Sequence, residues 1–251
     1  MELADKVCQV TGGTRGIGAA TAVELARRGA SVAICGRTPD DEAEAVVRAV
    51  EGLGRRCVVI TADMAKPDDA RRCVEDTARA FGGLDVLVHA AGGPAKGALL
   101  EVSEEIWYHA FDVHIHAVFH LCRAAIPLMR PRGEGAIVLV GSTAGRLGVV
   151  GAAAYATVKG ALIQLTRVLA REHANDNIRV NCVAPGVITT RFHEIMGLTP
   201  EARRNNLDNR IPLHREGTPE QVAQVIVMLA ENGYMTGETV TIDGGLTSRI
   251  A

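Results

Sequence analysis

The stretch from Thr11 to Gly18 reads TGGTRGIG and follows the apolar run KVCQV of residues 6–10. The apolar run predicts a buried strand and the residues after Gly16 predict a helix, so the glycines lie in a strand-to-helix turn. Gly12 would permit the tight turn, Gly16 would let backbone approach a pyrophosphate, and Gly18 would let the helix pack closely on the strand. Because the start of such a helix attracts phosphate, the stretch predicts a dinucleotide-binding turn.

Short aliphatic runs alternate with longer amphipathic runs along the rest of the chain. The aliphatic runs predict strands over residues 6–12, 31–36, 56–63, 84–92, 135–142, 178–186 and 238–243. The amphipathic runs predict helices over residues 16–29, 40–54, 67–82, 103–129, 152–174 and 219–231. Continuous Val, Ile and Leu runs are typical of strands covered on both faces, and repeated strand–helix units imply parallel strands. We therefore predict an α/β, doubly wound Rossmann fold, with a seven-stranded, mainly parallel sheet and helices on both faces.

The whole chain is expected to form one Rossmann-fold domain. Residues 1–251 contain no linker, repeat or low-complexity segment. The least regular part is polar and runs from about 189 to 212, directly after a predicted strand. Ligands bind at the carboxyl ends of strands in such sheets, so we expect this segment to form a substrate loop.

The composition argues against several classes of partner. Lysines and arginines number 27 against 29 aspartates and glutamates, and this balance does not suit a nucleic acid partner. No apolar run reaches the roughly 20 residues that span a membrane, and the start MELADKVCQV lacks the apolar region of a secretory signal. The six scattered cysteines form no CxxC pair and are expected as buried thiols in a reducing compartment. We therefore expect a cytoplasmic protein.

Three polar residues predict a catalytic group. Ser142 ends a predicted strand, and Tyr155 and Lys159 lie four residues apart on the following helix, so the last two share a face. Hydride transfer to a carbonyl leaves an alkoxide that needs a proton, and a tyrosine with its ordinary pKa of about 10 is a poor base at neutral pH. The cation of Lys159 would favour the phenolate, and Ser142 would stabilise charge on the substrate oxygen.

These motifs, in this order, resemble those of the short-chain dehydrogenase/reductase family, in its single-domain branch. The resemblance extends from Lys6 to about Leu246. Besides the glycine-rich turn and Ser142, it is carried by AAG at 90–92, YATVK at 155–159, APGVITT at 184–190 and TGETVTIDGG at 236–245. It implies an oxidoreductase that interconverts a small-molecule carbonyl and a secondary alcohol, with Tyr155 as general acid/base.

The resemblance also implies an assembly and a set of cofactor contacts. The assembly would be a homotetramer or a homodimer. Asp63, after the third predicted strand, resembles the family's adenine-contacting acid, and Lys159 would bond the nicotinamide ribose. The residues that the resemblance places at the cofactor are Gly12, Thr14, Arg15, Gly16, Ile17, Gly18, Arg37, Thr38, Asp63, Met64, Ala91, Gly92, Tyr155, Lys159, Pro185, Gly186, Ile188 and Thr190.

The sequence after the second predicted strand indicates which nicotinamide cofactor is used. An acidic residue there would hydrogen-bond the ribose 2′-hydroxyl of NAD, whereas an arginine accommodates the 2′-phosphate of NADP. Gly36 stands where NAD-preferring relatives carry the acid, and Arg37 follows it. Arg15 in the glycine-rich turn adds a second guanidinium, a group that binds phosphate through two hydrogen bonds. We therefore predict NADP(H) as the cofactor, with two solvated surface arginines as the alternative.

Four of the eight histidines lie on the long predicted helix. At about 100° per residue, His109, His116 and His120 share an outer stripe, whereas His114 lies among apolar residues. His114 occupies the place where the family most often has an asparagine, which helps to hold a water in a proton relay. An imidazole both donates and accepts, so His114 either replaces that amide in catalysis or is a core histidine bonded to a backbone carbonyl. We expect the outer stripe in a subunit interface or in solvent, and predict no metal site.

Three other functions stay open. A 3-oxoacyl-acyl-carrier-protein reductase needs basic residues that dock an acidic carrier, and Arg130, Arg132 and Arg171 are available. Asp176, however, stands where a basic docking residue is expected. A sugar or polyol dehydrogenase would suit the polar segment after Thr190. The third is a non-catalytic NADP-binding scaffold, although such relatives typically lose the tyrosine or the lysine.

Overall fold

Seven strands form one continuous sheet in the computed structural model, which describes residues 1–195 and 199–248. The strands are β1 (Val7–Thr11), β2 (Ser31–Gly36), β3 (Cys57–Thr61), β4 (Val86–His89), β5 (Gly135–Val140), β6 (Ile178–Pro185) and β7 (Thr239–Ile242). Their order is β3-β2-β1-β4-β5-β6-β7, and every neighbouring pair is parallel. The predicted seven-stranded, doubly wound sheet is confirmed, and it is parallel throughout.

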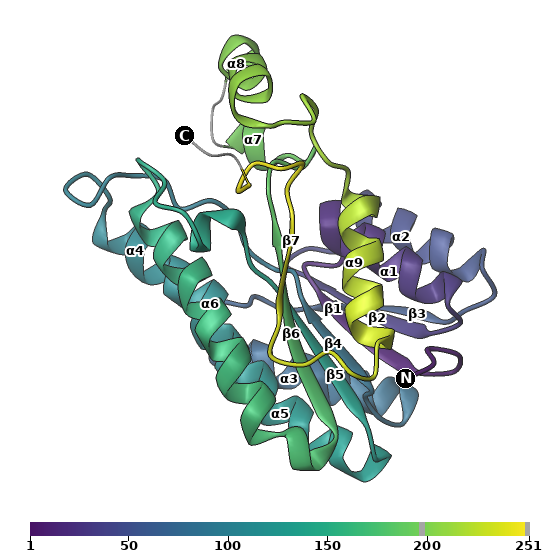
Figure 1. Ribbon diagram of the computed structural model, residues 1–251. Helices are drawn as coiled ribbons and strands as arrows, with labels where there is room; N and C mark the ends of the chain where they lie inside the picture. The colour runs from purple at the N-terminus through teal and green to yellow at the C-terminus, as the bar shows by residue number, and fades with distance from the viewer. Residues whose placement is uncertain (196–198, 249–251) are drawn as a thin grey trace.

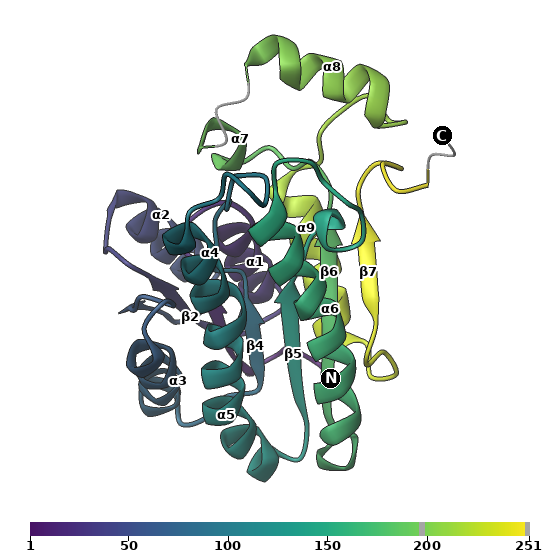
Figure 2. The ribbon, with the colours of Figure 1, turned by 90° about the vertical axis from the view of Figure 1, so that its left-hand side faces the viewer.

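Helices cover both faces of this sheet (Figures 1 and 2). One layer consists of α1 (Gly16–Arg27), α2 (Asp41–Glu51) and α9 (Pro219–Glu231). The other consists of α3 (Pro67–Phe81), α5 (Ala117–Met129) and α6 (Ala153–Glu172). Three further helices, α4 (Glu104–Phe111), α7 (Phe192–Ile195) and α8 (Pro200–Arg210), lie toward the edge where the strands end. In the part of the chain that the structure describes, no helix is long and apolar enough to cross a membrane.

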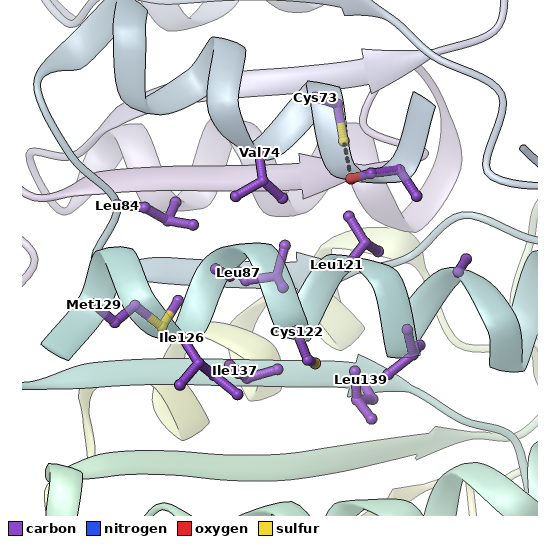
Figure 3. Packing of buried hydrophobic residues seen from close by; sticks show 14 of the residues in the cluster. Cys73, Val74, Leu84, Leu87, Leu121, Cys122, Ile126, Met129, Ile137 and Leu139 are labelled. Carbon is purple, nitrogen blue, oxygen red and sulfur yellow. Dashed lines mark hydrogen bonds between the residues drawn. The ribbon is translucent and has the colours of Figure 1, made fainter. Parts of the chain in front are cut away.

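The central strands are buried on both faces, which explains their continuous aliphatic sequences. In Figure 3, Leu121 of α5 lies toward Val74 of α3, and Leu87 and Ile137 of the sheet lie beneath the same helix. These four side chains are fully buried, and each is worth about 1.5–3 kcal/mol of transfer free energy. This packing fixes the strand ends on which the site is built.

The helix predicted over residues 103–129 is interrupted in the structure. α4 ends at Phe111, a π-helical turn covers Asp112–His116, and α5 begins at Ala117. Hydrogen bonds in such a turn run from i to i+5, so the turn adds a residue and rotates the helix on either side of it. Inside the turn, the carbonyl oxygen of Val113 lies 3.2 Å from Nε2 of His89 on β4.

The segment 189–212, expected to be the least regular part of the chain, contains the two helices α7 and α8. Thr199 caps α8 by accepting a hydrogen bond from the N–H of Ala202 at 3.2 Å, and Pro200 occupies the first helical position. No residue of α8 is buried, and the helix stands away from the sheet (Figure 1). Arg203 ties it to the body of the protein through an ion pair with Glu216.

Candidate active site

The glycine-rich turn joins β1 to α1 and leaves no space for side chains at Gly12, Gly13 and Gly18. Gly12 has a φ of +65°, and a Cβ there would lie 2.7 Å from the backbone of Ala91, just after β4. A Cβ on Gly18 would lie 2.1 Å from the carbonyl oxygen of Gly12. At Gly16, where φ is +54°, the nearest atom to a Cβ would be a methyl carbon of Thr190 at 3.5 Å. No side chain caps α1, so its first N–H groups suit an anion and the turn fits a dinucleotide.

The residues predicted to select the cofactor lie where β2 ends. An acidic residue at Gly36 has no room, because its Cβ would lie 2.6 Å from Cγ2 of the buried Thr14. Arg37 and Thr38 are exposed. Arg37 makes no hydrogen bond or ion pair with any described residue, so its guanidinium is available to an anion.

Arg15 differs from Arg37 because it already has two partners. Its Nη2 lies 2.5 Å from Oδ2 of Asp40, and its Nε lies 3.2 Å from Oε2 of Glu42. All three side chains are partly exposed, so the pairs are weak and can exchange. A phosphate at Arg15 has to compete with these carboxylates.

Four other predicted cofactor residues lie after the ends of β3 and β4. Asp63 accepts a hydrogen bond from the N–H of Ala65 at 3.1 Å. The side chain of Met64 is buried in the core, and its place at the cofactor stays a prediction. Ala91 and Gly92 follow β4, and a Cβ on Gly92 would lie 2.1 Å from the ring of His114.

The last group of predicted cofactor residues comes after β6, except for Ile17, which packs into the core under α1. Pro185 ends β6, and a Cβ on Gly186 would lie 2.7 Å from Cβ of Asp243. Ile188 is buried. The backbone N–H of the residue that starts α7 donates to Oγ1 of Thr190 at 3.4 Å. These residues place the start of the 189–212 segment directly over the glycine-rich turn.

The three predicted catalytic residues come together at the end of β5. Ser142 follows β5, and its side chain acts on the hydroxyl of Tyr155 to lower the pKa of the tyrosine. Lys159 donates from Nζ to the carbonyl oxygen of Val140, the last residue of β5, at 2.7 Å, and this Nζ lies 5.6 Å from the centroid of the Tyr155 ring. A Cβ on Gly145 would lie 2.5 Å from the backbone of Lys159, so the turn after Ser142 packs directly on α6. This contact fixes the serine relative to the tyrosine and the lysine.

Burial controls the charges of this group. Burial raises the pKa of Tyr155 to about 12, although the hydrogen bond with Ser142 acts to lower it. Burial also lowers the pKa of Lys159 to about 8. In the protein by itself, the loss of solvation is therefore the larger influence on the tyrosine pKa, and stabilisation of the phenolate by Lys159 stays a prediction. At neutral pH, Tyr155 is a protonated acid beside an ammonium group.

His114 is buried next to the catalytic residues. Its ring stands edge-on to Tyr155, with centroids 6.0 Å apart, and its Nε2 lies 3.2 Å from the carbonyl oxygen of Gly93. Because a carbonyl only accepts, Nε2 carries the proton in the neutral ring, and Nδ1 is an acceptor. Nδ1 is buried without a partner among the described residues. Burial, followed by the charge of Lys159, holds the pKa of His114 well below its ordinary value, so the ring is neutral at pH 7.

Sequence reasoning missed a second buried histidine, His89. Its Nδ1 lies 2.9 Å from Oγ1 of Thr11, and its Nε2 lies 3.2 Å from the carbonyl oxygen of Val113. Burial, with a smaller contribution from the charge of Lys159, lowers the pKa of His89 to about 3. The neutral ring therefore joins β1 and β4 to the π-turn that carries His114. The position of His89, directly before the AAG motif at 90–92, could have identified it from the sequence.

The other three histidines of this region lie on the outside, as predicted. His109 and His116 are exposed, and His120 is partly so. Nδ1 of His116 lies 2.8 Å from Oδ1 of Asp112, and Nδ1 of His120 lies 3.0 Å from Nη1 of Arg71. Over residues 1–195 and 199–248, no three His, Cys, Asp or Glu side chains gather as metal ligands would. Assembly through this face stays a prediction.

Comparison with known proteins places this site in a family. A family model described as enoyl-(acyl carrier protein) reductase matches residues 12–247. The 3-oxoacyl-acyl-carrier-protein reductase of Thermotoga maritima is 39% identical over 248 residues, 98% of this chain and 99% of that protein. L-Sorbose reductase from Gluconobacter frateurii, solved with NADPH and L-sorbose, has a TM-score of 0.91 and 30% identity, and the match covers 100% of both chains. A mutant short-chain dehydrogenase/reductase from Serratia marcescens has a TM-score of 0.90 and 35% identity, over 98% of this chain and 100% of that one.

The buried cation predicts a pH-dependent stability. A lysine pKa lowered from 10.5 to about 8 makes the charged form costly by about 3 kcal/mol below pH 8, a cost that disappears as pH rises to 10.5. We expect Lys159→Met to be more stable than wild type by the largest margin at pH 7. This difference in the free energy of unfolding should shrink by about 3 kcal/mol by pH 10.5. Chemical denaturation at several pH values measures this difference. The exposed Lys96→Met is the control and should show a constant difference; a constant difference for Lys159→Met as well would contradict the burial of a charge.

Proposed function

Because the chain belongs to the short-chain dehydrogenase/reductase family, we propose that it is an NADP(H)-dependent oxidoreductase that interconverts a carbonyl and a secondary alcohol. The observation that carries the proposal is the group of Ser142, Tyr155 and Lys159 at the end of β5, on the same sheet edge as the glycine-rich turn. A dinucleotide held by that turn lies along this edge, so its reactive end can reach the group. When bound, the nicotinamide supplies or accepts the hydride.

Tyr155 is the group that moves the proton. In carbonyl reduction its hydroxyl donates to the developing alkoxide, and burial keeps that hydroxyl protonated at neutral pH. In alcohol oxidation its phenolate accepts the proton, and the ammonium of Lys159 stabilises that phenolate below about pH 8. Ser142, whose side chain acts on the Tyr155 hydroxyl, holds the substrate oxygen and stabilises charge on it.

His114 supports the proton transfer through its unpartnered nitrogen. Nδ1 is a buried acceptor beside the Tyr155 ring, and a buried acceptor without a donor costs about 1–3 kcal/mol. A water or a hydroxyl group that donates to Nδ1 removes this cost and extends the hydrogen-bonded chain from the tyrosine. We assign His114 this role, in place of the amide expected at its position.

The residues after β2 support NADP(H) over NAD(H). Thr14 fills the space that an acidic residue at Gly36 would need, so no carboxylate is available there for the 2′-hydroxyl. Arg37 is exposed and unpaired among the described residues, as a ligand of a 2′-phosphate should be. Arg15 is the second ligand, once it leaves its carboxylate partners. The similar L-sorbose reductase was solved with NADPH, which agrees with this choice.

The similarity to a 3-oxoacyl-acyl-carrier-protein reductase favours that reaction as a second candidate. Acyl-carrier docking is disfavoured because most of the arginines that could bind a carrier already have partners. Arg130 pairs with Asp176 at 3.0 Å, and Arg132 makes two hydrogen bonds, of 2.7 and 2.8 Å, to the buried Asp85. Two of the three candidate arginines are thus engaged, which leaves the exposed Arg171.

A sugar or polyol dehydrogenase is a further alternative. The similarity to L-sorbose reductase and the exposed, polar α8 favour it. We propose that the 189–212 segment contacts the substrate in either case, in a single-domain cytoplasmic protein that works as a homotetramer or homodimer. A non-catalytic scaffold is disfavoured by the presence and arrangement of both Tyr155 and Lys159.

Cofactor titration tests the choice of NADP(H). Losing one charge-assisted phosphate contact costs about 1.5–3 kcal/mol, so we expect NADPH to bind at least tenfold more tightly than NADH. Arg37→Ala should remove most of this difference without weakening NADH. Nicotinamide fluorescence gives both Kd values, and Arg48→Ala, an exposed arginine of α2, is the matched control. Equal affinities in the wild-type protein would overturn the NADP(H) assignment.

Tyr155→Phe separates an enzyme from a scaffold. The variant keeps the ring and loses the proton, so we expect kcat to fall by about a hundredfold or more while the Kd for NADPH changes less than about threefold. NADPH oxidation is followed with diacetyl, a 3-oxoacyl thioester and a ketose as substrates. Turnover that survives in Tyr155→Phe would exclude the tyrosine as the acid. A scaffold would turn over none of the three in either form.

Variants of His114 test the supporting role. His114→Asn retains an acceptor and should keep kcat within about tenfold of wild type, whereas His114→Leu has no acceptor and should lose at least tenfold more. Because the pKa of His114 lies well below its ordinary value and the ring is neutral at pH 7, the profile of kcat against pH for His114→Asn should keep its shape above pH 7. Equal kcat values for the Asn and Leu variants would reduce His114 to a packing residue.

A further inference from the structure

An ion pair connects the substrate segment to the opposite side of the cofactor groove. Nη2 of Arg191, the residue before α7, lies 3.1 Å from Oε1 of Glu42, and its Nη1 donates to Oε2 at 3.4 Å. Glu42 is in the first turn of α2, 149 residues away in the sequence. The two residues are far apart in the sequence, so the ion pair shows that the segment after β6 lies next to the start of α2.

The topology of the sheet shows what this pair crosses. Arg191 follows β6 and Glu42 follows β2, and three strands, β1, β4 and β5, lie between them. The ends of those three strands carry the glycine-rich turn, Gly92 and Ser142. The ion pair therefore passes over the groove in which the dinucleotide is proposed to bind. In Figure 2, α7 lies above the ends of the strands, and α2 lies below it and to the left.

One neighbouring approach and one further ion pair flank the crossing. Next to Arg191, the methyl group of Thr190 lies 3.5 Å from the position of a Cβ on Gly16. On the other side, Glu42 also contacts Nε of Arg15 in the glycine-rich turn, at 3.2 Å. The segment, the turn and the start of α2 thus meet at one carboxylate.

We infer that Arg191 and Glu42 form a clasp that keeps the substrate segment closed over the bound dinucleotide and slows its dissociation. The inference rests on the dinucleotide binding proposed above and adds two residues outside the predicted contacts. A dinucleotide that lies under the pair leaves only when the segment lifts, and lifting separates Arg191 from Glu42. Both side chains are partly exposed, at 62% and 37%, so the effect is modest: such pairs correspond to about a two- to fivefold change in rate.

A double-mutant cycle on cofactor release tests the clasp. The protein is loaded with NADPH, the NADPH is displaced by excess NADP⁺, and the fluorescence decay gives the dissociation rate for wild type, Arg191→Gln, Glu42→Gln and the double variant. We expect Arg191→Gln to accelerate release about two- to fivefold, and to add nothing in the Glu42→Gln background. The acceleration should vanish in 1 M salt, where the screening length is about 3 Å. Glu44→Gln removes the same charge from the same helix and should leave the rate unchanged.

The outcomes separate the clasp from the proposed function. If Arg191→Gln leaves the dissociation rate unchanged, or accelerates it equally in both backgrounds, the clasp is refuted while cofactor binding stands. A wild-type protein whose NADPH fluorescence does not change on mixing refutes dinucleotide binding, and the clasp with it. The cycle also cancels the effect of Glu42 on Arg15, because that contact is lost equally in both Glu42→Gln proteins.

Discussion

All seven strands run in the same direction, and this constraint determines where the chemistry is placed. Each connection has to return through a helix to the other edge of the sheet, so every strand ends at one common edge. The glycine-rich turn, the two buried histidines and the serine–tyrosine–lysine group therefore meet there, although up to 148 residues separate Thr11 from Lys159. The helices that pack on both faces keep this edge rigid, and the segment after β6 closes over it.

Burial moves the ionisable groups of this edge toward their neutral forms. The pKa values of His89 and His114 fall, that of Lys159 falls to about 8, and that of Tyr155 rises to about 12. The lysine stays charged at neutral pH because its pKa remains at about 8, and its ammonium donates to the carbonyl oxygen of Val140. A single cation among neutral donors and acceptors is a site prepared for an oxygen atom on which negative charge develops.

The sequence predicted the features that depend on local patterns. Each of these features is a pattern within a few consecutive residues: the glycine spacing, the aliphatic strands and the Tyr155–Lys159 spacing. In the structure, the glycine-rich turn and the Tyr155–Lys159 pair lie at the same edge of the sheet, as expected. Contacts between distant residues could not be predicted in this way. In the π-turn, the Val113 carbonyl contacts His89 of β4. Arg15 is engaged by carboxylates at the start of another helix, and the pKa of Tyr155 follows from burial. α8 was missed despite a local signal, since Thr199 and Pro200 form a recognisable helix start.

The π-turn at Asp112–His116 limits how the chain can change in length during evolution. Removing one residue from it would restore an ordinary helix and turn everything before it by about 100° relative to α5. Ala110, which packs against Ala154 and Val158 of α6, would then rotate out of its contact, and His114 would no longer face the tyrosine. A single-residue deletion here would disrupt both the packing of Ala110 and the orientation of His114. A substitution would leave the rotation of the helix about its axis unchanged. The number of residues in the π-turn therefore determines which side chains of the preceding helix face α6.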